Sequence, residues 1–334
     1  MSLPDSPIVA TIPFDEDGAH HGYLRLPFSR DDSAWGSVMI PITVIRNGDG
    51  PTALLTGGNH GDEYEGPIAL QALSHELSPE EVTGRVIIVP FMNQPAFAAG
   101  RRTSPLDGGN LNRLFPGRPD GSPTEKIADY FIRTLVPMAD CVLDFHSGGK
   151  TLEFLPFAAA HLLDDPEQHA RCVAAMEAFN APYAMALREI DPVGMYDTAV
   201  EAAGKTFVTT ELYGGGTATA LSARIARKGT RNVLKHAGIL KGEIERAPST
   251  MIDTTAAGCY HFAELTGMME PLVDLGETVA EGDPLMRIWL TTITGEPALT
   301  VRSKRTGILA GRHFPGLVKL GDCLAVVATV TDAS

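Results

Sequence analysis

The amino-acid sequence predicts an α/β fold, with a mainly parallel or mixed sheet covered by helices on both faces and a small all-β region at the C-terminus. Three observations predict it. Continuous apolar runs at residues 52–55 and 141–143 are typical of strands that are buried on both faces. Segments with helix signals separate such runs up to about residue 240, as in βαβ units. Beyond residue 241 the helical period is lost, and short β-runs alternate with turn sequences.

The elements of the α/β part can be placed from their local signals. Ser122 is followed by proline at the first helical position and Glu125 at the third, a capping box for a helix that we expect to end at Pro137. Asp165, also followed by proline, begins the next helix. Gly229 weakens the last helix. In chain order we expect strands at residues 35–45, 52–55, 85–89, 141–143 and 206–210, and helices at residues 67–77, 122–136, 165–179 and 217–236.

The change in pattern predicts two domains. A chain of 334 residues is long enough for both. We expect an α/β domain that carries the chemistry at residues 1–245, and a β-sandwich or barrel that shapes or covers the active site at residues 246–334. The turns of the second domain resemble those of the biotinyl/lipoyl-like hammerhead. Lys304 lacks the neighbours of a modified lysine, so we expect no covalently attached cofactor.

Composition narrows the classes of partner. The formal net charge of −14 disfavours nucleic acid and anionic membranes, and no Lys/Arg-rich run offsets it. The sequence shows neither a membrane span nor a secretory signal, so we expect a cytoplasmic protein with a small-molecule ligand. The four cysteines are far apart, which predicts neither a disulfide framework nor a structural zinc cluster.

Two glycine-flanked strand ends carry possible metal ligands. The string T-G-G-N-H-G-D-E-Y-E-G-P places His60 and Glu63 three residues apart, and C-V-L-D-F-H-S-G-G supplies His146. Open α/β sheets bind ligands beyond the carboxyl ends of their strands, so both strings are expected to face one pocket. Imidazole and carboxylate suit Zn²⁺, and three protein ligands leave a position open for water. The sequence therefore predicts a catalytic site for one Zn²⁺ per subunit.

Two further carboxylates lie at strand ends. Glu211 follows the run at residues 206–210, and a carboxylate there is costly to bury without a partner or a task. It fits a general base near the metal, although a structural hydrogen-bond acceptor is the alternative. Asp144 lies two residues before His146, on the same face of a strand. It either orients that ligand or caps the strand end.

The string N-L-N-R-L-F-P-G supplies a pair of groups that suit a carboxylate. The guanidinium of Arg113 offers a bidentate fork, and Asn112 can donate a further hydrogen bond. We expect this pair to bind the carboxylate of an amino-acid substrate. Arg101 and Arg102 precede the string and are further candidates for the site.

The order H-x-x-E, N-R, D-x-H and a strand-borne Glu resembles the aspartoacylase/succinylglutamate desuccinylase family, which has a zinc-carboxypeptidase-like fold. The resemblance covers most of the chain, including the C-terminal β domain. It implies that His60, Glu63 and His146 hold Zn²⁺ and that Glu211 acts as general base and acid. Family members also tend to form homo-oligomers, so we expect one here.

The same resemblance assigns the remaining groups. It implies that Asn112 and Arg113 bind the substrate carboxylate. An upstream arginine of the family polarises the scissile carbonyl, which points to Arg102, although the longer spacing here leaves the adjacent Arg101 as a competitor. Asn110 stands where family members often have an aspartate that orients a ligating histidine. An amide oxygen can still accept that hydrogen bond.

The resemblance implies a deacylase of N-acyl amino acids. The longer strings, such as D-F-H-S-G-G-K-T-L-E-F-L-P-F and V-T-T-E-L-Y-G-G-G-T, make N-alpha-acetyl-L-2,4-diaminobutyrate, from ectoine degradation, the first substrate to expect. Its cationic side chain needs an acidic or aromatic neighbour, and the candidates are Asp62, Glu65, Glu189 and Asp191. Three alternatives stay open: another N-acyl amino acid as substrate, a zinc carboxypeptidase, and a non-catalytic metal-dependent binding protein.

Overall fold

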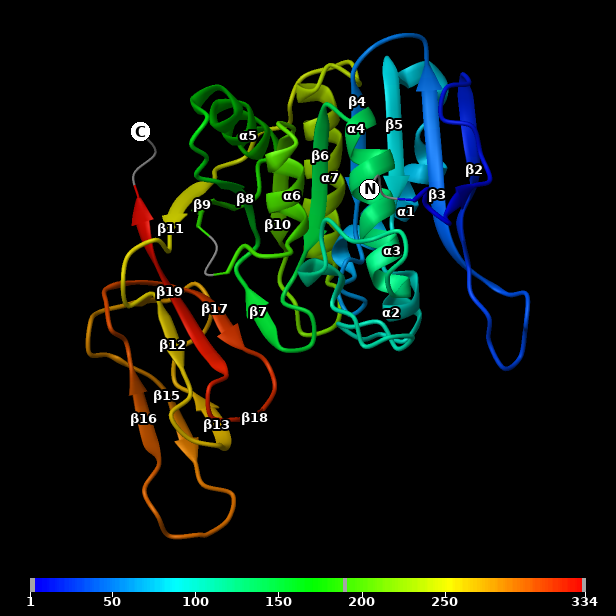
Figure 1. The fold of residues 1–334 in the computed structure, drawn as a ribbon. Helices are drawn as coiled ribbons and strands as arrows, with labels where there is room; N and C mark the ends of the chain where they lie inside the picture. The colour runs from blue at the N-terminus through cyan, green and yellow to red at the C-terminus, as the bar shows by residue number, and fades with distance from the viewer. Residues whose placement is uncertain (1–3, 189–190, 332–334) are drawn as a thin grey trace.

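The computed structural model describes residues 4–188 and 191–331 of the chain. Figure 1 shows an α/β part above a narrower region made of strands. The described helical segments are α1 (Glu65–Glu76), η1 (Pro79–Glu81), α2 (Gln94–Ala98), η2 (Leu111–Arg113), α3 (Pro123–Tyr130), η3 (Phe131–Leu135), α4 (Val136–Met138), α5 (Pro166–Phe179), α6 (Tyr196–Ala202) and α7 (Ala220–His236). The described strands up to Glu211 are β1 (Val9–Ala10), β2 (Gly18–Pro27), β3 (Ser37–Asn47), β4 (Thr52–Thr56), β5 (Gly84–Val89), β6 (Cys141–His146), β7 (Leu152–Phe154), β8 (Phe157–His161), β9 (Tyr183–Leu187) and β10 (Thr206–Glu211).

The described residues form a 15-stranded mixed sheet in the order β1-β2-β3-β5-β4-β6-β10-β8-β9-β11-β19-β17-β14, with β7 and β12 attached to β17 and β19. Its centre is parallel, because β5, β4, β6 and β10 pair in one direction. Strand β3 is antiparallel to β5, and β8 is antiparallel to β10. The predicted α/β class with a mixed sheet is confirmed.

The central strands read as continuous apolar runs because helices cover both faces of the sheet. Neighbouring residues such as Leu54 and Leu55 point to opposite faces, and each joins a different hydrophobic cluster. Leu55 packs in the cluster that includes α1, α5 and α7. Leu54 packs in the cluster that includes α3, η3 and α6. The carboxyl ends of the parallel strands are left open between these layers.

Local signals placed the helix starts well. The capping box at Ser122 is present, and the side chain of Asp165 accepts hydrogen bonds from two amides at the start of α5. The prediction that Pro137 ends its helix was wrong by one residue. The amide of Val136 donates to the carbonyl of Phe131, five residues back, so helical turns continue past Pro137 to Met138.

The C-terminal region is all-β, as predicted. Its strands are β11 (Thr250–Asp253), β12 (Tyr260–Phe262), β13 (Gly267–Pro271), β14 (Thr278–Val279), β15 (Pro284–Trp289), β16 (Leu299–Arg302), β17 (Gly307–His313), β18 (Leu317–Val318) and β19 (Cys323–Thr331). Strand β11 pairs with β9 of the α/β part and with β19, so the large sheet continues into this region. A separate sheet has the order β16-β15-β13-β18. The domain boundary between residues 245 and 246 falls between α7 and β11 and stays a prediction.

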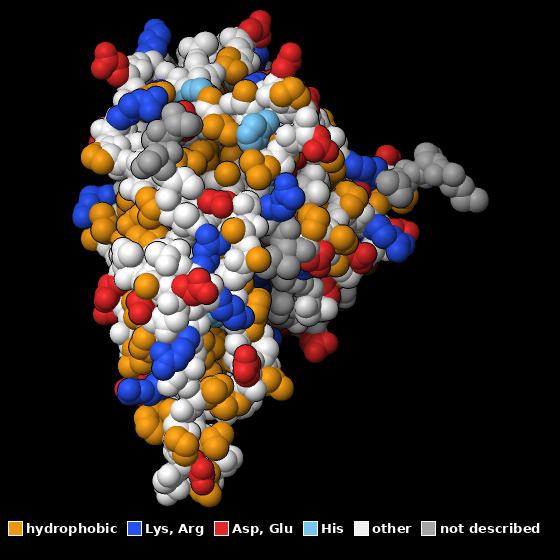
Figure 2. All heavy atoms as spheres, turned by 90° about the vertical axis from the view of Figure 1, so that its left-hand side faces the viewer, with side chains coloured by type: hydrophobic (Ala, Val, Ile, Leu, Met, Phe, Trp, Pro, Cys, Tyr) orange, Lys and Arg blue, Asp and Glu red, His pale blue; other side chains and the backbone are white. Residues whose placement is uncertain are grey.

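The separate sheet leaves an apolar stripe on its outer face. Leu317, Met268 and Trp289 are neighbours across β18, β13 and β15, and all three are exposed. Figure 2 shows hydrophobic side chains at this narrow end of the molecule. Among the described residues, no helix is long and apolar enough to cross a membrane.

Candidate metal centre and active site

The predicted ligands come together because the strands that carry them are neighbours. Strand β4 pairs with β6, and β6 pairs in parallel with β10, which places Glu211 opposite His146. His60 and Glu63 lie in the turn between β4 and α1. This turn needs glycine, since a Cβ at Gly61 would lie 2.0 Å from the backbone carbonyl carbon of Ala96. The carboxyl ends of the three strands therefore deliver polar groups to one place.

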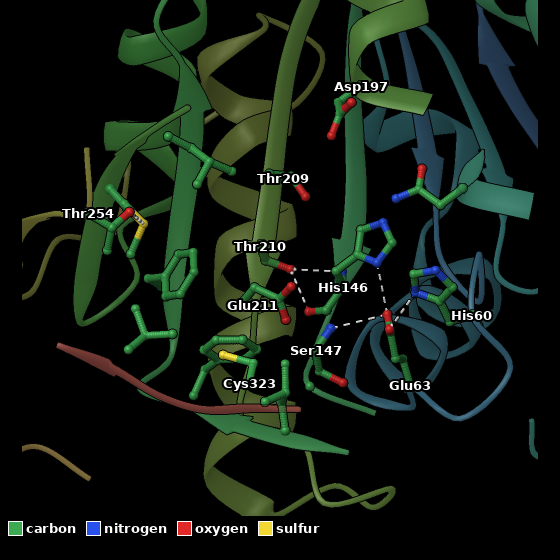
Figure 3. Close-up of a pocket in the computed structure, with 18 of the residues that line it drawn as sticks. His60, Glu63, His146, Ser147, Asp197, Thr209, Thr210, Glu211, Thr254 and Cys323 are labelled. Carbon is green, nitrogen blue, oxygen red and sulfur yellow. Dashed lines mark hydrogen bonds and ion pairs between the residues drawn. The ribbon is translucent and has the colours of Figure 1, made fainter. Parts of the chain in front are cut away.

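The carboxylate of Glu63 lies between the two imidazole rings (Figure 3). The Nδ1 atom of His60 is 2.6 Å from Oε1 of Glu63, and the Nδ1 atom of His146 is 3.0 Å from Oε2. One donor atom from each residue lies within 4.8 Å of the other two. His60 and Glu63 are buried, and His146 is nearly so. The set matches the three-ligand His, Glu, His pattern of metal sites with an open position.

The outer nitrogen of each imidazole has a partner of its own. The Nε2 atom of His60 is 3.2 Å from Oδ1 of Asn110, and the Nε2 atom of His146 is 3.0 Å from Oδ2 of Asp144. Asp144 also accepts a 2.6 Å hydrogen bond from the hydroxyl of Thr56. Because an oxygen at Nε2 favours the tautomer with its hydrogen there, the lone pair of Nδ1 is left for a metal.

Burial and charge set the ionisation of these groups. Burial lowers the pKa of His60 and outweighs the attraction of Glu63. Burial also disfavours a charged His146, but the carboxylates of Glu63 and Asp144 outweigh it and raise the pKa of His146 well above 6.5. For Glu63, burial is outweighed by the two histidines, which lower its pKa. A bound cation would replace the proton that these carboxylates hold on His146.

Arg102, and not Arg101, has its guanidinium at this site. Its Nη1 atom is 3.3 Å from Nδ1 of His60 and 3.8 Å from Oε1 of Glu63. A guanidinium can only donate, so it faces the lone pair of Nδ1. The backbone carbonyl of Arg101 instead accepts a hydrogen bond from the amide of Gly61.

A cavity of about 430 Å³ joins the metal-site residues to the other predicted groups. Glu211, Arg102, Asn112 and Arg113 all line it. The carbonyl oxygen of the Asn112 side chain accepts a 2.9 Å hydrogen bond from the amide of Tyr196, which fixes the orientation of that side chain. The C-terminal strands complete the wall with Tyr260, Ala310, Cys323 and Val326.

The four predicted partners of a cationic substrate group have different positions. Asp62 and Glu65 are buried and do not line the cavity. Burial raises the pKa of Glu65 to about 7. Asp191 lines the cavity and is exposed. Glu189 lies outside the described residues.

Sequence reasoning missed Asp197. This residue of α6 is buried and lines the cavity. The string D-P-V-G-M-Y-D-T around it carries no motif. Its position follows from the packing of α6 against β10 and could not be read from local signals.

Comparisons with known proteins agree with this geometry. The family model for the succinylglutamate desuccinylase/aspartoacylase catalytic domain matches residues 49–237. A protein of Halomonas elongata named N-alpha-acetyl-L-2,4-diaminobutyric acid deacetylase is 56% identical over 330 residues, which are 98% of this chain and 96% of that protein.

Solved structures extend the likeness to the whole fold. The product-bound structure of the ectoine utilization protein EutE (DoeB) from Ruegeria pomeroyi is 62% identical, with a TM-score of 0.96 over 98% of this chain and 99% of that one. A succinylglutamate desuccinylase/aspartoacylase structure from Rhodobacter sphaeroides is 40% identical, with a TM-score of 0.93 over 98% of this chain and 100% of that one.

Proposed function

This chain belongs to the succinylglutamate desuccinylase/aspartoacylase family, and on that premise we propose that it is a zinc-dependent deacetylase of N-alpha-acetyl-L-2,4-diaminobutyrate. One observation carries the chemistry: two imidazole Nδ1 atoms face the carboxylate of Glu63 in a cavity that Glu211 also lines. The names of the Halomonas and Ruegeria relatives support the substrate.

The donor set supports the metal. His60, Glu63 and His146 would hold the ion, and Asn110 and Asp144 hold the outer nitrogens of the two imidazoles. Two nitrogens and a carboxylate suit Zn²⁺, although Co²⁺ would also fit such a set. When bound, Zn²⁺ supplies Lewis acidity, which polarises a carbonyl group and makes water more acidic.

Glu211 moves the proton in this proposal. A carboxylate oxygen of Glu211 takes a proton from the water that attacks the acetyl carbonyl. The same oxygen then gives the proton to the nitrogen that leaves. The new C–O bond replaces the amide C–N bond, so one water is consumed and acetate and a free α-amine are released. The position of Glu211 beside His146 in the strand register supports this role.

Three cavity-lining groups orient the substrate and stabilise charge in this proposal. Asn112 and Arg113 bind its α-carboxylate, through the amide N–H and the guanidinium. Arg102 donates to the carbonyl oxygen as negative charge develops on it, and its place beside His60 supports this role. With the carboxylate and carbonyl held, the side chain of the substrate extends into the rest of the cavity.

The experiment is to incubate the zinc-loaded protein with N-alpha-acetyl-L-2,4-diaminobutyrate, its gamma-acetyl isomer, N-acetylaspartate and N-succinylglutamate. Release of acetate or succinate is followed with and without a chelator. Chelator-sensitive hydrolysis of the alpha-acetyl compound alone supports the proposal. Hydrolysis of another compound keeps the chemistry and rejects the substrate. No hydrolysis of any compound rejects the proposal. The predicted homo-oligomer is tested separately by light scattering.

A further inference from the structure

The cavity continues beyond the metal site to a buried carboxylate. In Figure 3, Asp197 and Thr209 lie above His146, whereas Glu63 and Ser147 lie below it. Both Asp197 and Thr209 line the cavity and are buried, with 7% and 8% of their surfaces exposed. Neither is needed to hold the metal or to move the proton. A carboxylate in a cavity wall is nevertheless a group that a ligand can contact.

The surroundings of Asp197 favour a cation. The Nε2 atom of the buried His161 is 3.9 Å from Oδ2 of Asp197, and its Nδ1 atom is 2.8 Å from Oε2 of Glu201. Two carboxylates therefore share one imidazole. These three side chains together carry a charge of −1 when His161 is protonated and −2 when it is neutral. A cationic ligand group in the cavity reduces that buried negative charge.

Asp197 is next in the chain to a residue that contacts the proposed binding site for the α-carboxylate. The amide of the preceding residue, Tyr196, donates to the side chain of Asn112. Asp197 therefore has a fixed position relative to the group that would hold the α-carboxylate. The short side chain of a substrate whose α-carboxylate is bound by Asn112 would extend along the cavity wall that contains Asp197.

We propose that Asp197 recognises the side chain of the substrate by accepting a charge-assisted hydrogen bond from its terminal ammonium group. This inference rests on the proposed deacetylase function. It assigns the specificity for a cationic amino acid to Asp197, with His161 and Glu201 as positioning residues. Asp191 also lines the cavity, but it is exposed and its carboxylate accepts from the amide of Val193. Water weakens the attraction of an exposed carboxylate.

The test compares two substrates of equal shape and different charge. N-alpha-acetyl-L-2,4-diaminobutyrate ends in an ammonium group, and N-acetyl-L-norvaline has a methyl group in its place. The measured quantity is the ratio of kcat/KM for the first substrate to that for the second. Asp197→Asn removes the charge but keeps the oxygen that accepts from the amide of Thr198. Asp191→Asn is the matched control, because it makes the same change at an exposed carboxylate that lines the cavity.

We expect the zinc-loaded wild type to prefer the cationic substrate. The ratio should fall by about 10- to 100-fold in Asp197→Asn, as expected for the loss of a hydrogen bond between charged groups. It should change by less than about threefold in Asp191→Asn, because exposed charge pairs contribute little. A merely structural role of Asp197 would lower both kcat/KM values and leave their ratio unchanged.

Two results would overturn the inference and keep the proposed function. One is an unchanged ratio in Asp197→Asn, and the other is equal hydrolysis of the two substrates by the wild type. Failure of the wild type to hydrolyse either substrate rejects the function itself, and the inference with it. If Asp197→Asn loses its thermal unfolding transition, Asp197→Ser replaces it, since a serine oxygen can also accept from the amide of Thr198.

Discussion

Replacing Asp144 by asparagine tests how the protein holds its metal. Asp144 is buried, accepts from Thr56 and lies 3.0 Å from Nε2 of His146. Asparagine has nearly the same shape, but it removes the charge and replaces one of the two oxygens by an NH2 group. Loss of such an outer partner typically weakens metal binding by about 10- to 100-fold, or about 1.4 to 2.8 kcal/mol. We expect Asp144→Asn to weaken zinc binding by that amount.

A second effect of the same carboxylate acts in the opposite direction. Against the effect of burial, Glu63 and Asp144 raise the pKa of His146 in the metal-free protein, and that proton must leave when a metal binds. The zinc affinity of the wild type should therefore rise with pH up to the pKa of His146. In Asp144→Asn this pKa is lower, so its affinity levels off at a lower pH. The two proteins should differ most at high pH.

The assay is competition for zinc with a chelator, measured from pH 6 to pH 9. Asn110→Asp is the matched variant, because it adds a carboxylate at the outer nitrogen of His60 and keeps the oxygen that accepts from the amide of Asn112. It should bind zinc as tightly as the wild type or up to about tenfold more tightly. If Asp144→Asn and the wild type bind zinc equally tightly in the pH range where neither affinity changes with pH, the reasoning is refuted.

Three further predictions follow from single side chains. Glu211→Gln should keep one zinc per chain, measured by elemental analysis, and lose about 10²- to 10⁴-fold in kcat, whereas substantial residual turnover would contradict its role as the base. Burial raises the pKa of Glu65 from 4.5 to about 7. Glu65 therefore stabilises the fold fully below pH 4.5, and its contribution to the free energy of unfolding falls by about 3 kcal/mol as the pH rises to 7. In denaturant unfolding of the metal-free protein, the stability of Glu65→Gln relative to the wild type should therefore rise between pH 5 and pH 8. A difference in the free energy of unfolding that stays constant over this range would contradict the prediction. Gly229→Ala would place a Cβ 2.3 Å from the ring of the buried Phe179, so it should destabilise by about 1–3 kcal/mol, a cost that exceeds the helix-propensity gain of about 1 kcal/mol. Thermal or denaturant unfolding measures this loss of stability. Arg224→Ala, at an exposed position, is the control and should change the stability by no more than about 0.5 kcal/mol. A Gly229→Ala variant that is more stable than the wild type would show that the ring can move.

The metal-site residues could be predicted because their signals are local. His60, Glu63 and His146 each lie in a glycine-flanked string that follows an apolar run. Parallel strands end at one edge of a sheet, so the strings converge once the strands are recognised. The order of the strands was not needed for this prediction. The contacts of Asp144 and Asn110 with the outer nitrogens lie where the sequence reasoning looked for them.

Other parts depend on distant contacts that leave no local signal. Strand β8 has the sequence F-A-A-A-H, which has low β-propensity and forms a strand between β10 and β9. The reversed direction of β8 relative to β10 is likewise a property of the assembled sheet. Asp197 enters the cavity through the packing of α6 and a hydrogen bond between residues 84 positions apart. The sequence named four other acids for that task, and of the three described only Asp191 lines the cavity.

The central claim is that His60, Glu63 and His146 form one metal site through the inward nitrogens of both imidazoles. Anomalous diffraction from crystals of the zinc-loaded protein tests it most directly. We predict one zinc peak per chain, about 2.0–2.1 Å from Nδ1 of His60 and Nδ1 of His146 and about 2.0–2.2 Å from the carboxylate of Glu63. A peak bonded to the Nε2 atoms, or a peak away from these three residues, would contradict the account.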